Sequence, residues 1–198
     1  VTAMGRNSGG VHGGGGGSYS QSQIESAIYD YVNGNSSEIN GWLRSPGSYV
    51  LSPDNVANMR ILDSILTAPV TNDVLYRKTE AKSIFGYLSQ SDYDKLYMHV
   101  VEGVPNGGVK NMIAKATGKT LTEKGYMSTS KSASISEDLD FAVKPIMLRI
   151  KPGKKAKGLD LDKHSIGEEE VLLKRKTKYK VKSVYGKRGS IYVDVDIV

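Results

Sequence analysis

Cysteine is absent from this chain of 198 residues. Its absence excludes disulfide bonds, thiolate metal sites and cysteine nucleophiles together, and it suits a protein that works in a reducing compartment or passes through several compartments. Histidine is also scarce: His12, His99 and His164 lie far apart and lack the spacing of a histidine metal motif. We therefore expect no metal.

Long apolar runs are missing as well. No run approaches the roughly 18 residues that a membrane span requires, so we expect no membrane span, and no signal peptide is recognisable. The chain begins at Val1 and Thr2 rather than Met, which leaves open whether the natural start is missing. Basic and aromatic residues are not interleaved as in RNA-binding sheets, and no recognition-helix pattern is present. We therefore expect no nucleic-acid partner.

Acidic residues are fewer than basic ones, and the net charge is +6. The excess lies mostly in residues 151–157 and 174–182, where lysines alternate with or border apolar residues. Such runs are typical of the wet face of strands. The alternative is attraction to an acidic partner or to the phosphates of a ligand.

Glycine dominates residues 5–17, which contain no core-forming pattern. We assign residues 1–19 to a flexible linker, which is either an expression remnant or the tether to an upstream part of a longer protein. The remainder, residues 20–198, is long enough for one domain with a sizeable core. We divide it into a helical lobe, residues 20–68, and a mixed α/β core, residues 69–198.

Sequence patterns typical of helix starts and ends predict three helices in the lobe. A capping-box pattern at Ser22 and Glu25 predicts a first helix that Asn33 and Gly34 end. A short second helix is expected around residues 39–43. Ser52 and Pro53 open a third, because a serine cap followed by proline is typical of a helix start.

Short strands and covering helices are expected in the core. The last strand alternates cleanly, with Ile191, Val193, Val195 and Ile197 inward and Tyr192, Asp194 and Asp196 outward. The expected helices are residues 91–101 and 108–117. The expected strands are residues 70–77, 125–130, 145–150, 171–173 with a continuation through 179–185, and 190–198.

Three consecutive acids, Glu168, Glu169 and Glu170, run directly into the aliphatic residues 171–173. Successive side chains of an extended strand point to opposite faces, so Glu168 and Glu170 would form a carboxylate pair while Glu169 faces away. The aliphatic residues would hold this pair at the edge of a rigid element. The alternative is a solvated acidic turn.

Two further polar features lie in expected strands. Arg77 ends the strand of residues 70–77, where an arginine is either a surface residue or a fixed bidentate donor for an anion. In the segment Ser128-Thr129-Ser130, the hydroxyls of Ser128 and Ser130 share one strand face.

Taken in order, Arg77, then Ser128-Thr129-Ser130, then Glu168-Glu169-Glu170 resemble the Arg, Ser-Thr-Ser, Glu-x-Glu signature of arginine-specific mono-ADP-ribosyltransferase toxins. Residues 26–31, 39–44, 148–153 and 176–179 resemble the catalytic chains of actin-modifying bacterial binary toxins. The resemblance covers about residues 20–198. It implies an α+β fold in which two small antiparallel or mixed sheets pack at a steep angle beside an N-terminal helical lobe, with NAD in the cleft.

The resemblance also implies roles. Glu170 would stabilise the oxocarbenium-like ribose that forms when nicotinamide leaves NAD, and Ser128 would orient Glu170. Arg77 would grip the pyrophosphate or adjacent ribose, and Thr129 and Ser130 would support the strand and the bound NAD.

Glu168 would select the acceptor, because in this family a glutamate there goes with arginine targets and a glutamine with asparagine or cysteine targets. Phe141 and Lys144 stand where relatives often place a phenylalanine and an arginine near the nicotinamide phosphates. His164 and Ser165 stand where relatives carry an aromatic residue that touches the substrate.

The implied protein is a secreted bacterial effector or toxin that acts in the host cytoplasm, with NAD and a host protein bearing an accessible arginine, such as actin, as partners. An upstream delivery or translocation component is compatible with the glycine-rich linker. We expect Tyr31 to pack on its own helix face; the alternative is that Tyr29 and Tyr31 contribute to the site. Two other functions stay open: an NAD glycohydrolase, or a catalytically silent binding module of a larger assembly.

Overall fold

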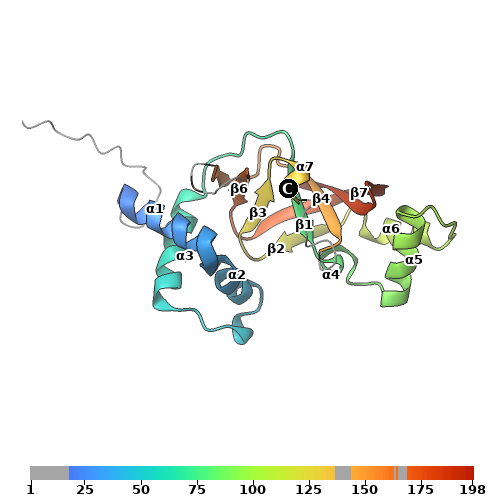
Figure 1. Ribbon diagram of the computed structural model, residues 1–198, viewed down its shortest axis with the longest axis horizontal. Coiled ribbons are helices and arrows are strands. Elements are labelled where there is room, and N and C mark those ends of the chain that lie inside the picture. Colours follow the sequence, from blue (N-terminus) through green and yellow to red (C-terminus); the bar gives the residue numbers. More distant parts are fainter. Residues whose placement is uncertain (1–17, 137–143, 163, 165–168) are drawn as a thin grey trace, which may run out of the picture.

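The computed structural model describes residues 18–136, 144–162, 164 and 169–198. A helical lobe lies at one end of the molecule, a sheet lies in the middle, and a second pair of helices lies at the other end (Figure 1). The helices are α1 Gln21–Asp30, α2 Ser36–Arg44, α3 Pro53–Ile65, α4 Ala81–Phe85, α5 Gln90–Val100, α6 Val109–Ala116 and α7 Ala133–Ser136, with the short turns η1 Tyr31–Asn35 and η2 Pro46–Ser48. The strands are β1 Leu75–Thr79, β2 Thr120–Glu123, β3 Met127–Ser130, β4 Ile146–Lys151, β5 Gly158–Asp160, β6 Glu170–Leu173, β7 Thr177–Lys187 and β8 Ser190–Ile197.

The first helix begins two residues earlier than its expected capping box. Ser20 has an extended backbone, its side chain accepts from the Gln23 backbone N–H, and the Gln23 side chain accepts from the Ser20 backbone N–H. The expected cap at Ser22 is therefore wrong. The same Ser-x-x-Glu/Gln pattern also fits at Ser20, and Ser22 lies inside the helix.

The other helix signals of the lobe are confirmed. Asn33 and Gly34 lie in η1 and leave the helical conformation, with φ 154° at Gly34, and this break separates α1 from α2. Ser52 caps α3 by accepting from the Asn55 backbone N–H at 3.2 Å, and Pro53 opens that helix.

The lobe packs on one side of the sheet. Its buried residues, among them Ile28, Ile39 and Leu62, form a cluster that also contains Tyr126 next to β3 and Leu172 of β6. The other face of β6 contributes Val171 and Leu173 to a second and larger cluster, which lies under α4, α5 and α6. The sheet thus separates two cores, and residues that alternate along β6 point into different ones.

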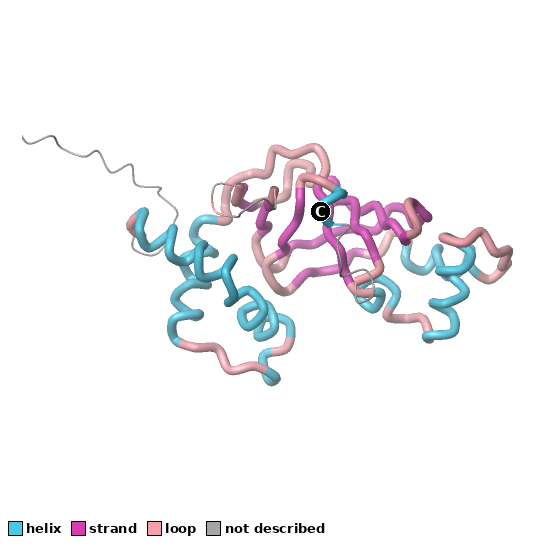
Figure 2. Tube along the Cα trace, in the orientation of Figure 1, coloured by secondary structure: helices cyan, strands magenta, loops and turns pink. Residues whose placement is uncertain are grey.

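The strand order is β2-β7-β8-β4-β1-β3-β6-β5. Figure 2 shows the strands gathered in the middle of the molecule, with helices at both ends. Pairing is antiparallel throughout except between β4 and β8. The α+β class is confirmed. Two sheets were expected, but the strands form one continuous sheet. The two parts are joined because β1 pairs with β3 at a single position, Tyr76 with Ser130. Five strands lie on one side of this junction and three on the other.

The strands are largely where they were expected, but one begins later, one is divided and two are additional. The first strand begins at Leu75 rather than at residue 70, because Val70 donates to the Ala156 carbonyl at 3.0 Å and belongs to the connection before β1. Residues 171–173 and 179–185 are not one strand, since Lys176 has φ 63° and β6 and β7 pair with different neighbours. The short strands β2 and β5 were not expected.

The alternation along β8 holds except at one residue. Ile191, Val193, Val195 and Ile197 are buried, and the two aspartates are partly exposed. Tyr192, expected outward, is buried because Tyr185 lies opposite it on β7, with ring centroids 5.8 Å apart.

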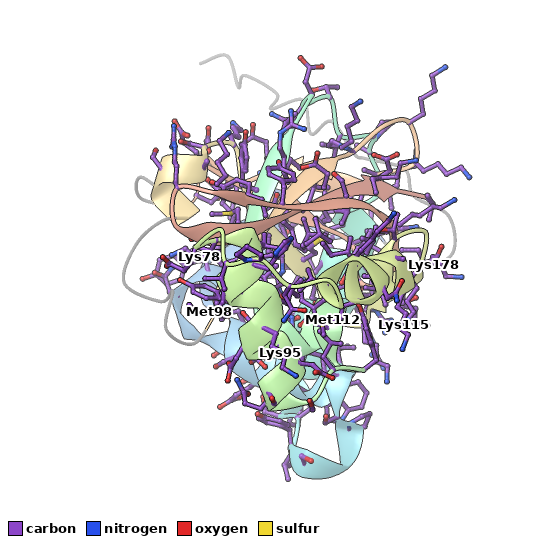
Figure 3. All side chains as sticks on the ribbon, turned by 90° about the vertical axis from the view of Figure 1, so that its right-hand side faces the viewer. Lys78, Lys95, Met98, Met112, Lys115 and Lys178 are labelled. Carbon is purple, nitrogen blue, oxygen red and sulfur yellow. The ribbon has the colours of Figure 1, made fainter. Side chains whose placement is uncertain are left out.

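The helices α5 and α6 form the end of the molecule that is opposite to the lobe. Figure 3 looks onto this end, where Lys95 and Met98 lie on α5 and Met112 and Lys115 lie on α6. Tyr87 fixes α6 to the rest of the chain by donating to the Met112 carbonyl. In the part of the chain that the structure describes, no helix is both long and apolar enough to cross a membrane.

Candidate active site

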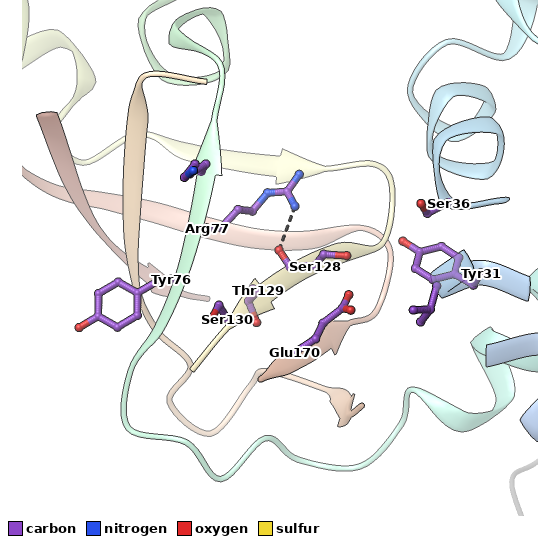
Figure 4. Close-up of a pocket in the computed structure, with 10 residues that line it drawn as sticks. Tyr31, Ser36, Tyr76, Arg77, Ser128, Thr129, Ser130 and Glu170 are labelled. Atoms are coloured by element: carbon purple, nitrogen blue, oxygen red, sulfur yellow. Dashed lines mark hydrogen bonds between the residues drawn. The ribbon is translucent and has the colours of Figure 1, made fainter. Parts of the chain in front are cut away.

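A pocket of about 340 Å³ opens between the helical lobe and the junction of β1, β3 and β6 (Figure 4). It lies where the two parts of the sheet meet, so three strands contribute to it within a few residues of the Tyr76 and Ser130 pair. The lining residues are Tyr31, Val32 and Ser36 from the lobe, Tyr76, Arg77 and Lys78 from β1, Ser128, Thr129 and Ser130 from β3, and Glu170 from β6.

Five residues that the sequence singled out meet at this pocket. They are Arg77, Ser128, Thr129, Ser130 and Glu170. The register explains why: Ser130 lies opposite both Tyr76 of β1 and Glu170 of β6, which brings the three strands together although their sequences lie far apart.

Glu170 is the first residue of β6, and only 7% of its surface is exposed. It shares a strand face with Leu172, whose side chain lies in the core under the lobe. Its carboxylate therefore points toward the lobe, and Figure 4 shows it reaching toward the space between Ser128 and Tyr31. A carboxylate held on a rigid strand in a partly dehydrated pocket can stabilise positive charge that develops beside it.

The alternation of side chains that was expected along residues 168–170 does not extend to Glu169, the residue before β6. Glu169 has φ 43° and an exposed side chain, so the extended strand starts at Glu170 and simple alternation does not include Glu169. The Glu169 carbonyl nevertheless accepts from the Lys131 backbone N–H at 3.0 Å, which continues the pairing of β3 with β6. Glu168 lies outside the described residues, so its pairing with Glu170 stays a prediction.

The three hydroxyls of β3 have different partners. The Thr129 hydroxyl donates to the Val171 carbonyl at 2.6 Å and ties β3 to β6. The Ser130 hydroxyl donates to the Ser132 carbonyl at 2.9 Å and shapes the turn after the strand. The Ser128 side chain lowers the pKa of the Tyr31 hydroxyl, and both residues line the pocket. That Ser128 orients Glu170 stays a prediction.

Arg77 is not a surface residue, since only 18% of its side chain is exposed. Its Nη1 donates to the Ser128 carbonyl at 2.9 Å, and its Nη2 lies 3.5 Å from Oε2 of Glu123. Burial lowers the pKa of Arg77, and the charge of Glu123 opposes that shift. Arg77 is therefore a fixed cation at the pocket, as the anion-donor alternative requires.

Tyr31 packs in the core of the lobe and also lines the pocket, and its contribution to a bound ligand stays a prediction. It is 1% exposed and packs edge-on against Tyr126, with ring centroids 5.7 Å apart, yet it also lines the pocket. Burial raises the pKa of Tyr31, although the hydrogen bond from Asn40 and the influence of the Ser128 side chain act in the opposite direction. Tyr29, by contrast, is 65% exposed and does not line the pocket.

Two charged residues close to the site were missed by sequence reasoning. Glu123 ends β2 and contacts both Arg77 and Arg44 of α2. Neither position stands out in the sequence, because β2 is a short strand whose burial alternates only weakly and Arg44 is the last residue of an ordinary helix.

Of the remaining predicted residues, Lys144 and His164 are described and do not line the pocket. Lys144 is exposed just before β4 and is not among the lining residues. Phe141 and Ser165 lie outside the described residues. His164 is partly buried, and its backbone N–H donates to the Leu161 carbonyl. Among the described residues, no group of histidine and carboxylate side chains is placed to hold a metal ion.

Comparison with known proteins identifies the family to which the chain belongs. Residues 17–195 match the family model of the ADP-ribosyltransferase exoenzymes, and the chain belongs to this family. C3stau2 from S. aureus, solved with NAD, shares 27% identity over 90% of this chain and 87% of that one, with a TM-score of 0.68. Plx2a, an ADP-ribosyltransferase toxin from Paenibacillus larvae, shares 25% identity over 89% and 86%, with a TM-score of 0.64.

The enzymatic component C2-I of the C2-toxin from Clostridium botulinum shares only the fold. Its identity is 16%, its TM-score is 0.62, and the match covers 89% of this chain and 43% of that one. A search of curated proteins finds no match. Together the family and the fold define a mono-ADP-ribosyltransferase of the bacterial toxin type.

Proposed function

We propose that this enzyme transfers one ADP-ribose from NAD to an arginine of a host protein and releases nicotinamide. The observation that carries the proposal is the buried carboxylate of Glu170, which faces the same pocket as the fixed guanidinium of Arg77. NAD as the donor is supported by C3stau2, a relative of similar fold that was solved with NAD.

The chemistry suits these groups. When the bond between the anomeric carbon and the nicotinamide nitrogen breaks, the electron pair leaves with nicotinamide and the ribose becomes oxocarbenium-like. Glu170 supplies the negative charge that stabilises this ribose, and it can also accept a hydrogen bond from the ribose 2′ hydroxyl. The acceptor nitrogen then attacks from the opposite face and loses a proton, which inverts the anomeric carbon.

The charges around the pocket match the rest of NAD. Arg77 and Lys78 bring two cations to the wall that β1 contributes, while Glu170 lies on the wall that β6 contributes. A pyrophosphate is best held by the planar guanidinium of arginine, which offers donors in a fixed fork. We assign the pyrophosphate or adjacent ribose to Arg77 and the nicotinamide ribose to Glu170.

The assignment of arginine as the acceptor rests on Glu168 and is argued from the sequence. A guanidinium is a poor nucleophile until a carboxylate orients it or takes its proton. A glutamate two residues before Glu170 supplies that group. We place the catalytic unit in residues 20–198 and propose that it acts in the host cytoplasm after secretion.

Incubation of the protein with labelled NAD and a host-cell lysate tests the proposal. Mass spectrometry of the labelled proteins should find ADP-ribose on arginine. Modification of asparagine or cysteine would contradict the acceptor that Glu168 implies. Release of nicotinamide without any labelled protein would identify an NAD glycohydrolase, and absence of both reactions would indicate a silent binding module.

A further inference from the structure

We propose that Glu123 is a positioning residue of this site, whose carboxylate fixes the Arg77 guanidinium and connects it to the helical lobe through Arg44. The inference rests on the proposed use of NAD. It assigns a task to a residue that does not line the pocket and that acts on the ligand only through Arg77.

The Glu123 carboxylate has three partners from three parts of the chain. Its Oε1 accepts from Nε of Arg44 on α2 at 2.9 Å and from the backbone N–H of Gly125 at 2.9 Å. Its Oε2 lies 3.5 Å from Nη2 of Arg77 on β1. Only 15% of the Glu123 side chain is exposed, so these contacts are partly shielded from water.

Arg77 is consequently held at two points. Nη1 donates to the Ser128 carbonyl, and Nη2 faces Glu123. A planar guanidinium that is contacted at both terminal nitrogens cannot turn about its long axis without losing one of the contacts. These contacts use two of its five N–H groups, which leaves donor capacity for an anion in the pocket.

Charge gives a second reason for the arrangement. Burial lowers the pKa of Arg77, the charge of Glu123 raises it, and the charge of Arg44 lowers it again. Glu123 is thus the negative charge between two arginines. Burial by itself would raise the pKa of Glu123, but the Arg44 hydrogen bond and the two positive charges outweigh that effect and lower it. The carboxylate is therefore ionised at neutral pH, and its loss would leave two like charges facing each other.

The residues that follow Glu123 are clamped to the lobe as well. The Tyr126 backbone N–H donates to Oδ1 of Asn40 at 2.9 Å, and Nδ2 of Asn40 donates to the Tyr31 hydroxyl at 2.9 Å. A Cβ atom at Gly125 would lie 2.7 Å from Oδ1 of Asn40, so the backbone approaches α2 as closely as glycine allows. The turn after β2 thus contacts Arg77 through Glu123, and it contacts Tyr31 of the lobe indirectly through Asn40.

The test compares the wild-type protein, residues 1–198, with Glu123→Gln, Glu123→Asp and the control Glu102→Gln, an exposed glutamate just after α5. Nicotinamide release gives kcat and KM for NAD, and calorimetry gives Kd. Glu123→Gln should raise KM and Kd by about tenfold while kcat changes by less than about threefold, because ground-state binding is lost and Glu170 is untouched. Glu123→Asp should recover part of the affinity, and Glu102→Gln should match the wild type.

A double-mutant cycle separates positioning from general damage to the fold. In the background of Arg77→Lys, Glu123→Gln should weaken NAD binding by less than about twofold more, because the group that Glu123 holds is already gone. Additive losses, an unchanged KM in Glu123→Gln, or an effect on kcat alone would overturn the inference.

Two further outcomes remain decisive. Should Glu123→Gln fail to fold, Glu123→Asp provides the test, since it keeps the charge but withdraws the carboxylate by one carbon; a wild-type KM in that variant would overturn the inference. A wild-type protein that neither binds nor cleaves NAD would overturn the proposed function itself. That result is distinguished from an active protein in which Glu123 is dispensable.

Discussion

Glu170 and Arg77 carry the opposite charges of the candidate site, and each is fixed by a different means. Glu170 is fixed by its place at the start of β6, where the following residues are buried in two cores. Arg77 is fixed by contacts of its own side chain with the Ser128 carbonyl and with Glu123. The carboxylate is therefore placed by the backbone, whereas the guanidinium depends on its neighbours.

Arg77→Lys tests the guanidinium directly. Lysine keeps the positive charge but is a point charge that cannot contact two partners in one plane and still donate to an anion. We expect NAD affinity to fall by about tenfold or more, the range found for charge-assisted hydrogen bonds. Calorimetric titration with NAD provides the measurement, and an unchanged Kd would show that only the charge of Arg77 matters.

Glu168→Gln tests the division of labour between the acids. The substitution leaves Glu170 in place but removes the group that is assigned to the acceptor arginine. Protein modification should collapse, while NAD hydrolysis should survive within about tenfold, because water needs less activation once an oxocarbenium has formed. Both rates are measured on one preparation with a labelled acceptor and free nicotinamide. Equal loss of both would contradict separate roles.

Among the elements, the strands that carry the site could be predicted only in part. The order of Arg77, Ser128-Thr129-Ser130 and Glu170 in the sequence pointed to one site, and the structure brings these residues to one pocket. The positive φ of Glu169 could not be predicted, because its sequence neighbours look like a continuing strand. The role of Glu123 was equally hidden, since its two arginine partners are 79 residues away at Arg44 and on a different strand at Arg77.

One prediction from charge patterning is confirmed at this scale. Lys178, Lys180 and Lys182 are exposed on β7, while the alternating residues Tyr179 and Val181 are buried. This part of the basic run is therefore the wet face of a strand, as alternation predicts. Such a pattern needs only local information, whereas the contacts of Glu123 depend on the packing of the lobe against the sheet.

The connection between lobe and sheet should depend on pH in a defined direction. Arg44 and Arg77 lower the pKa of Glu123 below its ordinary value of about 4.3. A carboxyl group with a lowered pKa in the folded state contributes stability above its unfolded pKa and loses it as the pH falls through the folded pKa. The loss of Tm in Glu123→Gln should thus be constant from about pH 8 to 5 and should shrink below about pH 4.

Thermal unfolding of wild type and variant across this pH range provides the measurement. The groups facing the carboxylate are the guanidinium groups of Arg44 and Arg77 and the hydroxyl of Tyr179. Burial raises the pKa of Tyr179, so this hydroxyl stays neutral throughout the range. A difference in Tm that does not change between pH 8 and 3 would contradict a charge-based contact.

At the scale of the whole molecule, the candidate site lies at the boundary between the helical lobe and the sheet. The lobe supplies Tyr31, Val32 and Ser36, and the junction of the two parts of the sheet supplies the other lining residues. Within the part of the chain that the structure describes, the lining residues run from Tyr31 to Glu170. The family match also begins at residue 17, close to the first helix. The folded unit from Ser20 onward is therefore proposed to suffice for NAD binding.

Deletion of residues 1–18 should leave the Kd for NAD and the Tm unchanged. Ser20 must be kept, because its side chain caps α1, and Ser20→Ala should lower stability by about 1 kcal/mol. The deletion and the substitution are compared by calorimetry and thermal unfolding. A large loss of NAD affinity in the deletion variant alone would show that the glycine-rich segment has been misinterpreted.

The central claim is that the buried carboxylate of Glu170 stabilises the ribose as nicotinamide leaves. It is tested most directly by the rate of nicotinamide release from NAD in Glu170→Gln, with Glu169→Gln as the matched control. Glu169 is adjacent in sequence, but its side chain is exposed and does not line the pocket. Glu170→Gln should lower kcat by roughly 100- to 1,000-fold, as for other preorganised electrostatic groups, while Glu169→Gln stays within about twofold of the wild type. Equal rates for the wild type and Glu170→Gln, or an equal loss in both variants, would contradict the account.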